Sequence, residues 1–241
     1  MKINPLYILP NLFTGASIYL GILSVSYAFL GRFELACWLV LISLIFDGLD
    51  GRVARLTGTT SKFGVEFDSL ADIIAFGVAP AMILFFYIGF SYGKLGIAIS
   101  GLYVVFGAIR LARFNVSTGN SEPNVFIGLP IPAAAVFIVS WLMCEMVFAK
   151  LYPEYSKEFL FILMICVLLI GLLMVSNIRY PSFKKINFYN ISFGKIIVFL
   201  MMFLAVLFIY PIYTVVSLIT AYVFFGPLRA GYYIFFKKTI K

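Results

Sequence analysis

Long apolar stretches recur along this chain and constrain its fold more than any other feature. A membrane-spanning helix needs about 20 mostly apolar residues, and eight such stretches lie near residues 6–30, 34–56, 65–91, 94–116, 127–149, 157–177, 193–210 and 211–236. The chain is 63% hydrophobic and only 12% charged, whereas a soluble domain carries about 25% charged residues. Because lipid cannot satisfy an open backbone, the sequence predicts an all-α, polytopic transmembrane bundle of about eight helices.

The basic residues predict how this bundle is oriented. With the N-terminus in the cytoplasm, 14 of the 18 Lys and Arg residues fall on the cytoplasmic side. The last two stretches, 193–210 and 211–236, meet at a very short hairpin around Pro211, and merging them would place the C-terminal basic cluster outside. We therefore predict a cell-membrane protein with both termini cytoplasmic and a single domain over residues 1–241.

Composition also excludes several classes of chemistry. The chain has no histidine, which removes Ser-His catalysis and His-ligated zinc. The three cysteines are scattered within apolar stretches without metal-ligand spacing, so we interpret them as small buried residues. We interpret the net charge of +8 as basic residues that orient the protein in the membrane and attract anionic lipid. No nucleic acid is expected as a partner, because no aromatic and basic patch lies in a soluble segment.

All four aspartates of the chain fall between residues 47 and 72. Asp47 and Asp50 share one face of a helix at a spacing of i, i+3, and Asp68 and Asp72 share a face of the next helix at i, i+4. The polar turn between them would let the two helices run antiparallel, so that the four carboxylates converge. Carboxylates at membrane depth are functional candidates by default.

Four converging anions predict bound cations, since they cannot all remain ionised at low dielectric without them. Ligation by oxygen alone selects hard divalent ions, Mg²⁺, Mn²⁺ or Ca²⁺. Two such ions would suit phosphoryl chemistry. A cation transporter or channel that uses the aspartates as a pathway, and a non-catalytic membrane scaffold, are the alternatives from other functional classes.

Small residues accompany the carboxylates. Gly51 and Ala54 lie on or beside the face of Asp47, and Gly64 stands one turn before Asp68. They would clear space where a phosphate-bearing ligand approaches the backbone. The alternative is close packing of helices through small residues, which is common in membranes.

The aspartates and small residues together form a pattern: Asp47-Gly-Leu-Asp50-Gly51-Arg-Val-Ala54-Arg55, then Gly64, Asp68 and Asp72. This pattern resembles the complete signature of the CDP-alcohol phosphatidyltransferases, with no departure at any signature position. The resemblance implies a binuclear metal site on the four aspartates, with Asp72 also acting as general base. It implies binding of the CDP-lipid by Asn11, Thr14, Gly51, Ala54, Arg55, Ser61 and Gly64. It also implies a homodimer.

Further segments resemble one branch of that family, the membrane-embedded phosphatidylserine synthases. They are Asp68 to Ala81, Arg110-Leu-Ala-Arg113-Phe-Asn115, Gly128 to Ala135, and Tyr180 to Lys184. The resemblance covers positions from about 8 to 185 and implies L-serine as the acceptor. The last two predicted spans, 193–210 and 211–236, are supported by hydropathy and not by a motif.

An acceptor serine needs partners for its carboxylate and its ammonium group. Arg110 and Arg113, with Asn115, are candidates for the carboxylate, because a guanidinium binds a carboxylate through two parallel hydrogen bonds. Glu66 is the nearest spare carboxylate for the ammonium. The alternative for Arg110 and Arg113 is that they extend from a helix end to water. Arg55 could instead anchor the topology on the cytoplasmic side, and Glu66 could simply face water.

The hypothesis from sequence is transfer of a phosphatidyl or archaetidyl group from CDP-diacylglycerol or CDP-archaeol to the hydroxyl of L-serine, with release of CMP at the cytoplasmic side of the membrane. The alternative keeps this chemistry with glycerol phosphate or inositol phosphate as acceptor. These acceptors carry a phosphate dianion and would need a larger basic pocket than Arg110 and Arg113 provide.

Overall fold

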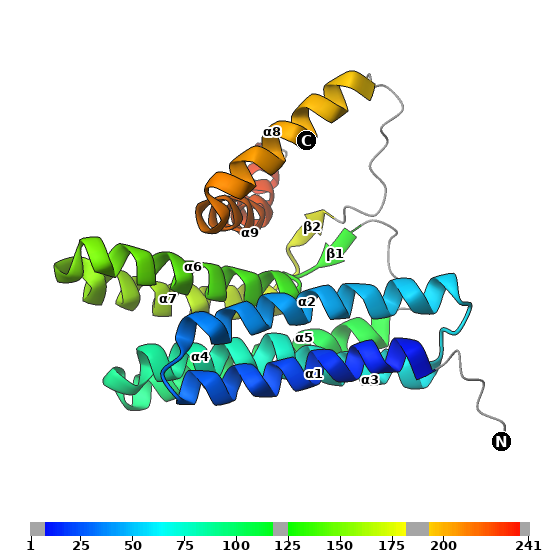
Figure 1. Ribbon diagram of the computed structural model, residues 1–241, viewed down its shortest axis with the longest axis horizontal. Coiled ribbons are helices and arrows are strands. Elements are labelled where there is room, and N and C mark those ends of the chain that lie inside the picture. Colours follow the sequence, from blue (N-terminus) through cyan, green and yellow to red (C-terminus); the bar gives the residue numbers. More distant parts are fainter. Residues whose placement is uncertain (1–7, 118–124, 182–192, 237–241) are drawn as a thin grey trace.

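The computed structural model describes residues 8–117, 125–181 and 193–236, and these are almost entirely helical (Figure 1). The longer helices are α1 (Ile8–Phe29), α2 (Phe33–Leu56), α3 (Lys62–Asp72), α4 (Ala79–Tyr87), α5 (Lys94–Ser117), α6 (Ile131–Leu151), α7 (Ser156–Val175), α8 (Phe193–Ile209) and α9 (Pro211–Phe236). Short helical turns connect some of them: η2 (Ile73–Val78), η3 (Gly89–Tyr92) and η4 (Pro153–Tyr155). The predicted all-α polytopic bundle is confirmed.

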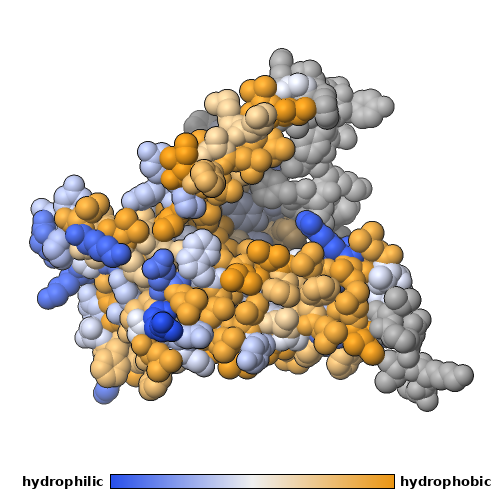
Figure 2. Space-filling view, viewed as in Figure 1, coloured by the Kyte–Doolittle hydropathy of each residue, from blue (hydrophilic) through white to orange (hydrophobic). Residues whose placement is uncertain are grey.

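Six of the described helical segments are long and apolar enough to cross a membrane. They correspond to six of the eight predicted stretches. Of the other two, α2 has 24 residues but carries Glu34 and the charged residues of the signature near its end. Helix α8 has 17 residues, fewer than the 20 or so that a membrane-spanning helix needs. Apolar side chains cover most of the face in Figure 2, as expected for a surface in contact with lipid.

The helices pack in three groups. Helices α1 and α2 form an antiparallel pair, and α1 also contacts α3, η2 and α4. Helix α5 packs on α7, and α6 lies between α2 and α9. Helices α8 and α9 pack on each other and stand apart from the first five helices (Figure 1). The aspartate-bearing helices α2 and α3 therefore lie in the group that α1 holds together.

A short antiparallel sheet was not expected from the sequence. Strand β1 (Val125–Ile127) pairs with β2 (Arg179–Pro181), with Phe126 opposite Tyr180. The predicted helix over 127–149 therefore begins only at Ile131. Gly128 separates strand from helix with a φ of 78°, and a side chain there would overlap the Met174 carbonyl. The predicted start of this helix was wrong by four residues, because the chain before Gly128 satisfies its backbone by β1–β2 pairing.

The third predicted stretch, 65–91, is shifted and is not one regular helix. Ser61 caps α3 by accepting a hydrogen bond from the Gly64 backbone N–H at 3.0 Å, so the helix begins at Lys62. Directly after Asp72 the chain widens into the π-helical turn η2. Such turns are frequent at functional sites. Tyr103 donates to the Phe76 carbonyl of this turn at 2.9 Å, which ties η2 to α5.

Candidate active site

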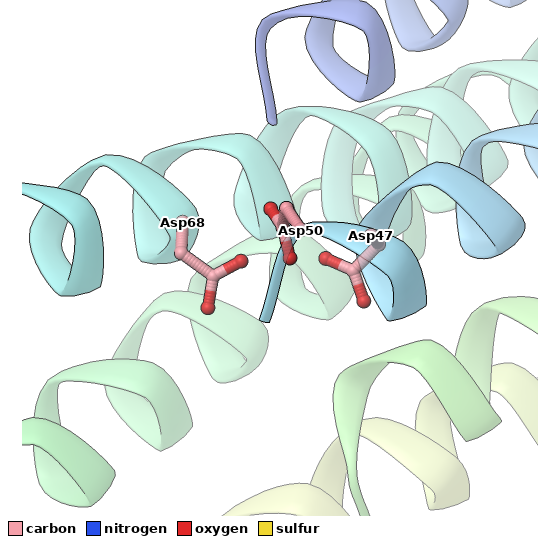
Figure 3. A group of neighbouring side chains, drawn as sticks. All are labelled: Asp47, Asp50 and Asp68. Atoms are coloured by element: carbon pink, nitrogen blue, oxygen red, sulfur yellow. The ribbon is translucent and has the colours of Figure 1, made fainter. Parts of the chain in front are cut away.

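Three of the four aspartates converge between α2 and α3. Asp47, Asp50 and Asp68 each offer a carboxylate oxygen, and these atoms all lie within 4.8 Å of one another. Figure 3 shows the carboxylates of Asp47 and Asp68 pointing toward the same space from the two helices, with Asp50 between them. Spacing on two consecutive helices predicted this convergence, and the structure confirms it for these three residues.

The position of Asp50 is fixed by α1. The hydroxyl of Thr14 donates to Asp50 Oδ2 at 2.5 Å, and the Gly51 backbone N–H donates to Asp50 Oδ1. Both Thr14 and Asp50 are buried, with exposed fractions of 4% and 5%. A hydrogen bond to a charged group contributes about 1.5–3 kcal/mol. The first helix therefore belongs to the site, because it orients one of the carboxylates.

Asp72 completes the aspartate group from the end of α3. Its carboxyl lies within hydrogen-bonding contact of that of Asp47 and in the electrostatic field of Asp68 and Arg110. Its Oδ1 atom is shielded from solvent and has no hydrogen-bond partner among the described residues. A buried, unpartnered carboxylate oxygen costs free energy, so this atom is suited to binding an ion or a substrate.

The donor set fits a hard divalent cation. The aspartates supply only oxygen ligands, as Mg²⁺, Mn²⁺ and Ca²⁺ prefer. Three oxygens already stand close enough to share an ion, and the carboxyl of Asp72 contacts that of Asp47. Asp47, Asp50 and Asp68 therefore fit a hard cation in their chemistry and in their spacing.

A cleft opens beside the aspartates, between α1, α2 and α3. Asp50 and Asp68 reach into it. Its wall contains every residue that we expected to bind the CDP-lipid: Asn11, Thr14, Gly51, Ala54, Arg55, Ser61 and Gly64. Pro10, Thr59, Thr60 and Val65 complete the lining. The expected lipid-nucleotide residues thus share one cavity that contacts the carboxylates.

The two glycines in the cleft differ in what surrounds them. A Cβ atom at Gly51 would lie 3.5 Å from the Arg55 guanidinium and would project into the cleft. A Cβ atom at Gly64 would lie 3.3 Å from Ser61 Oγ, the atom that caps α3. Space for ligand is the clearer requirement at Gly51, whereas Gly64 also serves the turn that starts α3.

The four residues expected to bind serine do not form one group. Asn115 donates to Glu66 Oε2 at 3.3 Å and to Ser69 Oγ at 3.0 Å, which links the end of α5 to α3. Arg110 lies apart from this pair, on the side of Asp72. The structure therefore brings Glu66 and Asn115 together, and Arg110 to the proposed base.

Arg113 is engaged with backbone instead. Its terminal nitrogens donate to the carbonyls of Met174, Val175, Ser176 and Ile127 at 2.8–3.2 Å. These carbonyls belong to the end of α7 and to β1, where helix carbonyls have no partner within the helix. Arg113 therefore holds the end of α7 against α5, which is a structural role that the sequence did not reveal.

Arg110 has the opposite environment. Its side chain is 7% exposed, and its Nε has no hydrogen-bond partner among the described residues. The guanidinium lies 5.5 Å from the centre of the Phe114 ring and within electrostatic range of Tyr222 on α9. A buried guanidinium with an unused donor next to Asp72 is suited to receiving an anionic group.

Comparison with known sequences identifies the family. The sequence model of the CDP-alcohol phosphatidyltransferases matches residues 7–155, which include α1 to α6 and every aspartate. The chain belongs to this family. Its members generally use divalent metal ions, in agreement with the aspartate group described above.

Similar proteins extend this assignment over nearly the whole chain. The CDP-diacylglycerol–serine O-phosphatidyltransferase of Helicobacter pylori is 53% identical over 229 residues, which cover 95% of this chain and 93% of that protein. The archaetidylserine synthase of Methanothermobacter thermautotrophicus is 40% identical over 182 residues, which cover 75% of this chain and 72% of that protein. Both similarities extend beyond the residues that the family model matches.

Sequence reasoning missed several residues of this phosphatidyltransferase site. Thr59 and Thr60 line the cleft, and their place in the polar turn before Ser61 was the available signal. Ser69 joins Asn115, and its position beside Asp68 was the only clue. Nothing in the sequence placed Tyr222 near Arg110, because the two are joined only by the packing of α9. Lys184, the end of a segment that carries the resemblance, lies outside the described residues.

Proposed function

We propose that this protein transfers the phosphatidyl group of a CDP-activated lipid to the hydroxyl of L-serine, forming phosphatidylserine and releasing CMP. The observation that carries the proposal is the meeting of the Asp47, Asp50 and Asp68 carboxylates at the edge of a cleft that all seven expected CDP-lipid residues line. The 53% identical serine O-phosphatidyltransferase of H. pylori supports serine as the acceptor.

The metal-binding role falls to Asp47, Asp50, Asp68 and Asp72. We propose two ions per site, Mg²⁺ or Mn²⁺, with Ca²⁺ as the remaining hard cation that oxygen ligands would accept. When bound, the ions neutralise negative charge on the diphosphate. Thr14 and the Gly51 N–H keep Asp50 oriented for this task.

The cleft residues hold the donor substrate. Arg55 pairs with the diphosphate through its planar donor fork. Asn11, Thr14 and Ser61 offer polar groups to the cytidine, while Gly51, Ala54 and Gly64 leave room for it. The lipid tails stay in the bilayer, and both CDP-diacylglycerol and CDP-archaeol fit this arrangement because tails make only apolar contacts.

The acceptor side supplies the base and the carboxylate partner. Asp72 takes the proton of the serine hydroxyl, and the serine oxygen forms a bond to the β-phosphorus. The bond from that phosphorus to the oxygen bridging to the α-phosphate breaks, and CMP leaves with the electron pair. Arg110 binds the serine carboxylate, Glu66 and Asn115 face its ammonium end, and Arg113 holds α5 and α7 in place for both.

The setting of the reaction follows from the predicted topology. We propose that the protein resides in the cell membrane, with its active site and both termini on the cytoplasmic side. The whole chain, 1–241, acts as one domain, in which α7, α8 and α9 extend the part that the family model matches. A homodimer is proposed from the family resemblance.

The decisive test uses the purified full-length protein in detergent with CDP-diacylglycerol, L-serine and Mg²⁺ or Mn²⁺. We expect CMP and phosphatidylserine in equal amounts, and no product when EDTA removes the divalent ions. Metal-independent turnover would contradict the proposed metal centre.

Competition among acceptors tests the substrate. Glycerol phosphate or inositol phosphate should release CMP much more slowly than serine, because Arg110 is a single buried cation. Faster CMP release with either phosphate acceptor would leave the proposed transfer reaction in place but would contradict serine as the acceptor.

A further inference from the structure

A second pocket lies between β2 and α9. Arg179 enters it from β2, and Arg229 and Tyr233 enter it from α9. It shares no lining residue with the aspartate cleft. All of its described lining residues follow residue 155, the last that the family model matches. We call it the basic pocket.

The basic pocket lies at the same end of the bundle as the aspartates. Asn115, at the end of α5, contacts Ser69 next to Asp68. Two residues earlier on α5, Arg113 donates to Asn177 Oδ1 at 3.4 Å, and Asn177 lines the basic pocket. With the topology proposed above, both sites face the cytoplasmic edge of the membrane.

The architecture of the basic pocket is set by close contact between α9 and β2. A side chain at Gly226 would overlap the ring of Tyr180, so only glycine permits this approach. The Tyr180 hydroxyl donates to the Val223 carbonyl at 3.2 Å. Burial raises the pKa of Tyr180 to about 12, and the phenol therefore stays a neutral donor. The two arginines are thus presented by fixed elements.

The charge of the basic pocket is positive. None of its described lining residues is acidic. The Arg229 guanidinium lies 5.8 Å from the centre of the Tyr233 ring, which orients it over an aromatic face. Two arginines that line one space suit a phosphate group, because each guanidinium can bind a phosphate through paired hydrogen bonds.

The surroundings favour a lipid over a free phosphate. Phe225 lies one turn before Arg229 on the same face of α9 and is exposed, as are its neighbours Phe224 and Leu228. Arg229 stands seven residues before the end of α9, or about 10 Å along the axis. Arginine and tyrosine at this depth are typical of the headgroup level of a bilayer. A phosphate on Arg229 would place attached acyl chains along the apolar face of α9.

We propose that the basic pocket binds the phosphate group of an anionic phospholipid, at a site separate from the one where a CDP-lipid reacts. This inference does not depend on the transferase activity, because it uses neither the aspartates nor their cleft. It assigns a ligand to the space between β2 and α9.

The test compares Arg179→Gln/Arg229→Gln with the wild-type protein in detergent, with EDTA present to keep the aspartate site free of divalent ions. The probes are dioctanoyl phosphatidic acid, dioctanoylglycerol, which has the same tails without phosphate, and inorganic phosphate. Dioctanoyl phosphatidic acid should raise the Tm of the wild-type protein, and the double variant should need at least about 10-fold more of it. Lys150→Gln, which removes a cation elsewhere, should respond as wild type.

Two outcomes would overturn the proposal: equal affinity of the double variant and the wild-type protein for dioctanoyl phosphatidic acid, or an equal Tm shift with dioctanoylglycerol. An equal shift with inorganic phosphate would overturn the lipid assignment. If the double variant does not fold, the wild-type protein is cross-linked with a photoreactive phosphatidic acid and digested. Label on α9 near Arg229 supports the proposal, and label confined to other helices overturns it.

Discussion

The two sides of the active site differ in how the chain builds them. On the nucleotide side, the seven residues expected from the family resemblance line one cleft between three consecutive helices. On the acceptor side, the four expected residues separate: Glu66 meets Asn115, Arg110 lies beside Asp72, and Arg113 binds the end of α7. The difference teaches that helical spacing predicts which residues meet when they lie on consecutive helices. Contacts between helices that are distant in the sequence depend on tertiary packing instead.

The largest effect should come from the proposed base, where the two sides meet. Asp72→Asn keeps the size of the side chain but removes its basicity. General-base catalysis typically contributes about 10²–10⁴-fold, so the serine-dependent rate of CMP release should fall by roughly that factor. Glu66→Gln is the matched carboxyl-to-amide control. Turnover of Asp72→Asn near the wild-type value would remove Asp72 from this role.

A smaller effect is expected in the cleft, on the side that the sequence specified. Gly51→Leu places a side chain beside Arg55 and in the space of the nucleotide. Overpacking costs about 1–3 kcal/mol, so the KM for CDP-diacylglycerol should rise about 10- to 100-fold. The control is Gly48→Leu, three residues earlier on α2, where a Cβ would meet nothing within 4 Å. Equal kinetics for the two variants would contradict the role of the cleft.

The two arginines of α5 sharpen the comparison on the acceptor side. Arg110→Lys should raise the KM for serine about 10-fold at unchanged KM for CDP-diacylglycerol, because a lysine cannot bind a carboxylate bidentately. Arg113→Lys should instead lower the free energy of unfolding by about 1–3 kcal/mol, since it removes hydrogen bonds to the α7 carbonyls. Steady-state kinetics and denaturation measure the two effects. A reversed pattern would exchange the assigned roles.

The smallest effect is expected at Glu66, which is exposed at the rim of the site. An exposed ion pair contributes roughly 0.5 kcal/mol, so Glu66→Gln should raise the KM for serine only about 2-fold. Because solvent ions screen such a pair, the effect should shrink as salt is added. A KM increase like that of Arg110→Lys would show that Glu66 lies deeper in the acceptor site than this structure places it.

The sequence by itself determined the membrane bundle and the donor half of the site. Apolar stretches of helix length specify the bundle, because lipid forces the backbone to satisfy its hydrogen bonds within each segment. The spacings of Asp47 to Asp50 and of Asp68 to Asp72 specify a shared face, because a helix repeats every 3.6 residues. The turn between the two helices then brings the faces together.

Tertiary structure alone decided the rest. The β1–β2 sheet joins segments that are about 50 residues apart, and no local pattern encodes that pairing. The roles of Arg110 and Arg113 were also undecided, since both occupy the end of the same helix. What separates them is the neighbour that packing supplies: Asp72 for one, the open carbonyls of α7 for the other. Long-range packing sets these neighbours, because it follows from how all the apolar faces fit together rather than from local spacing.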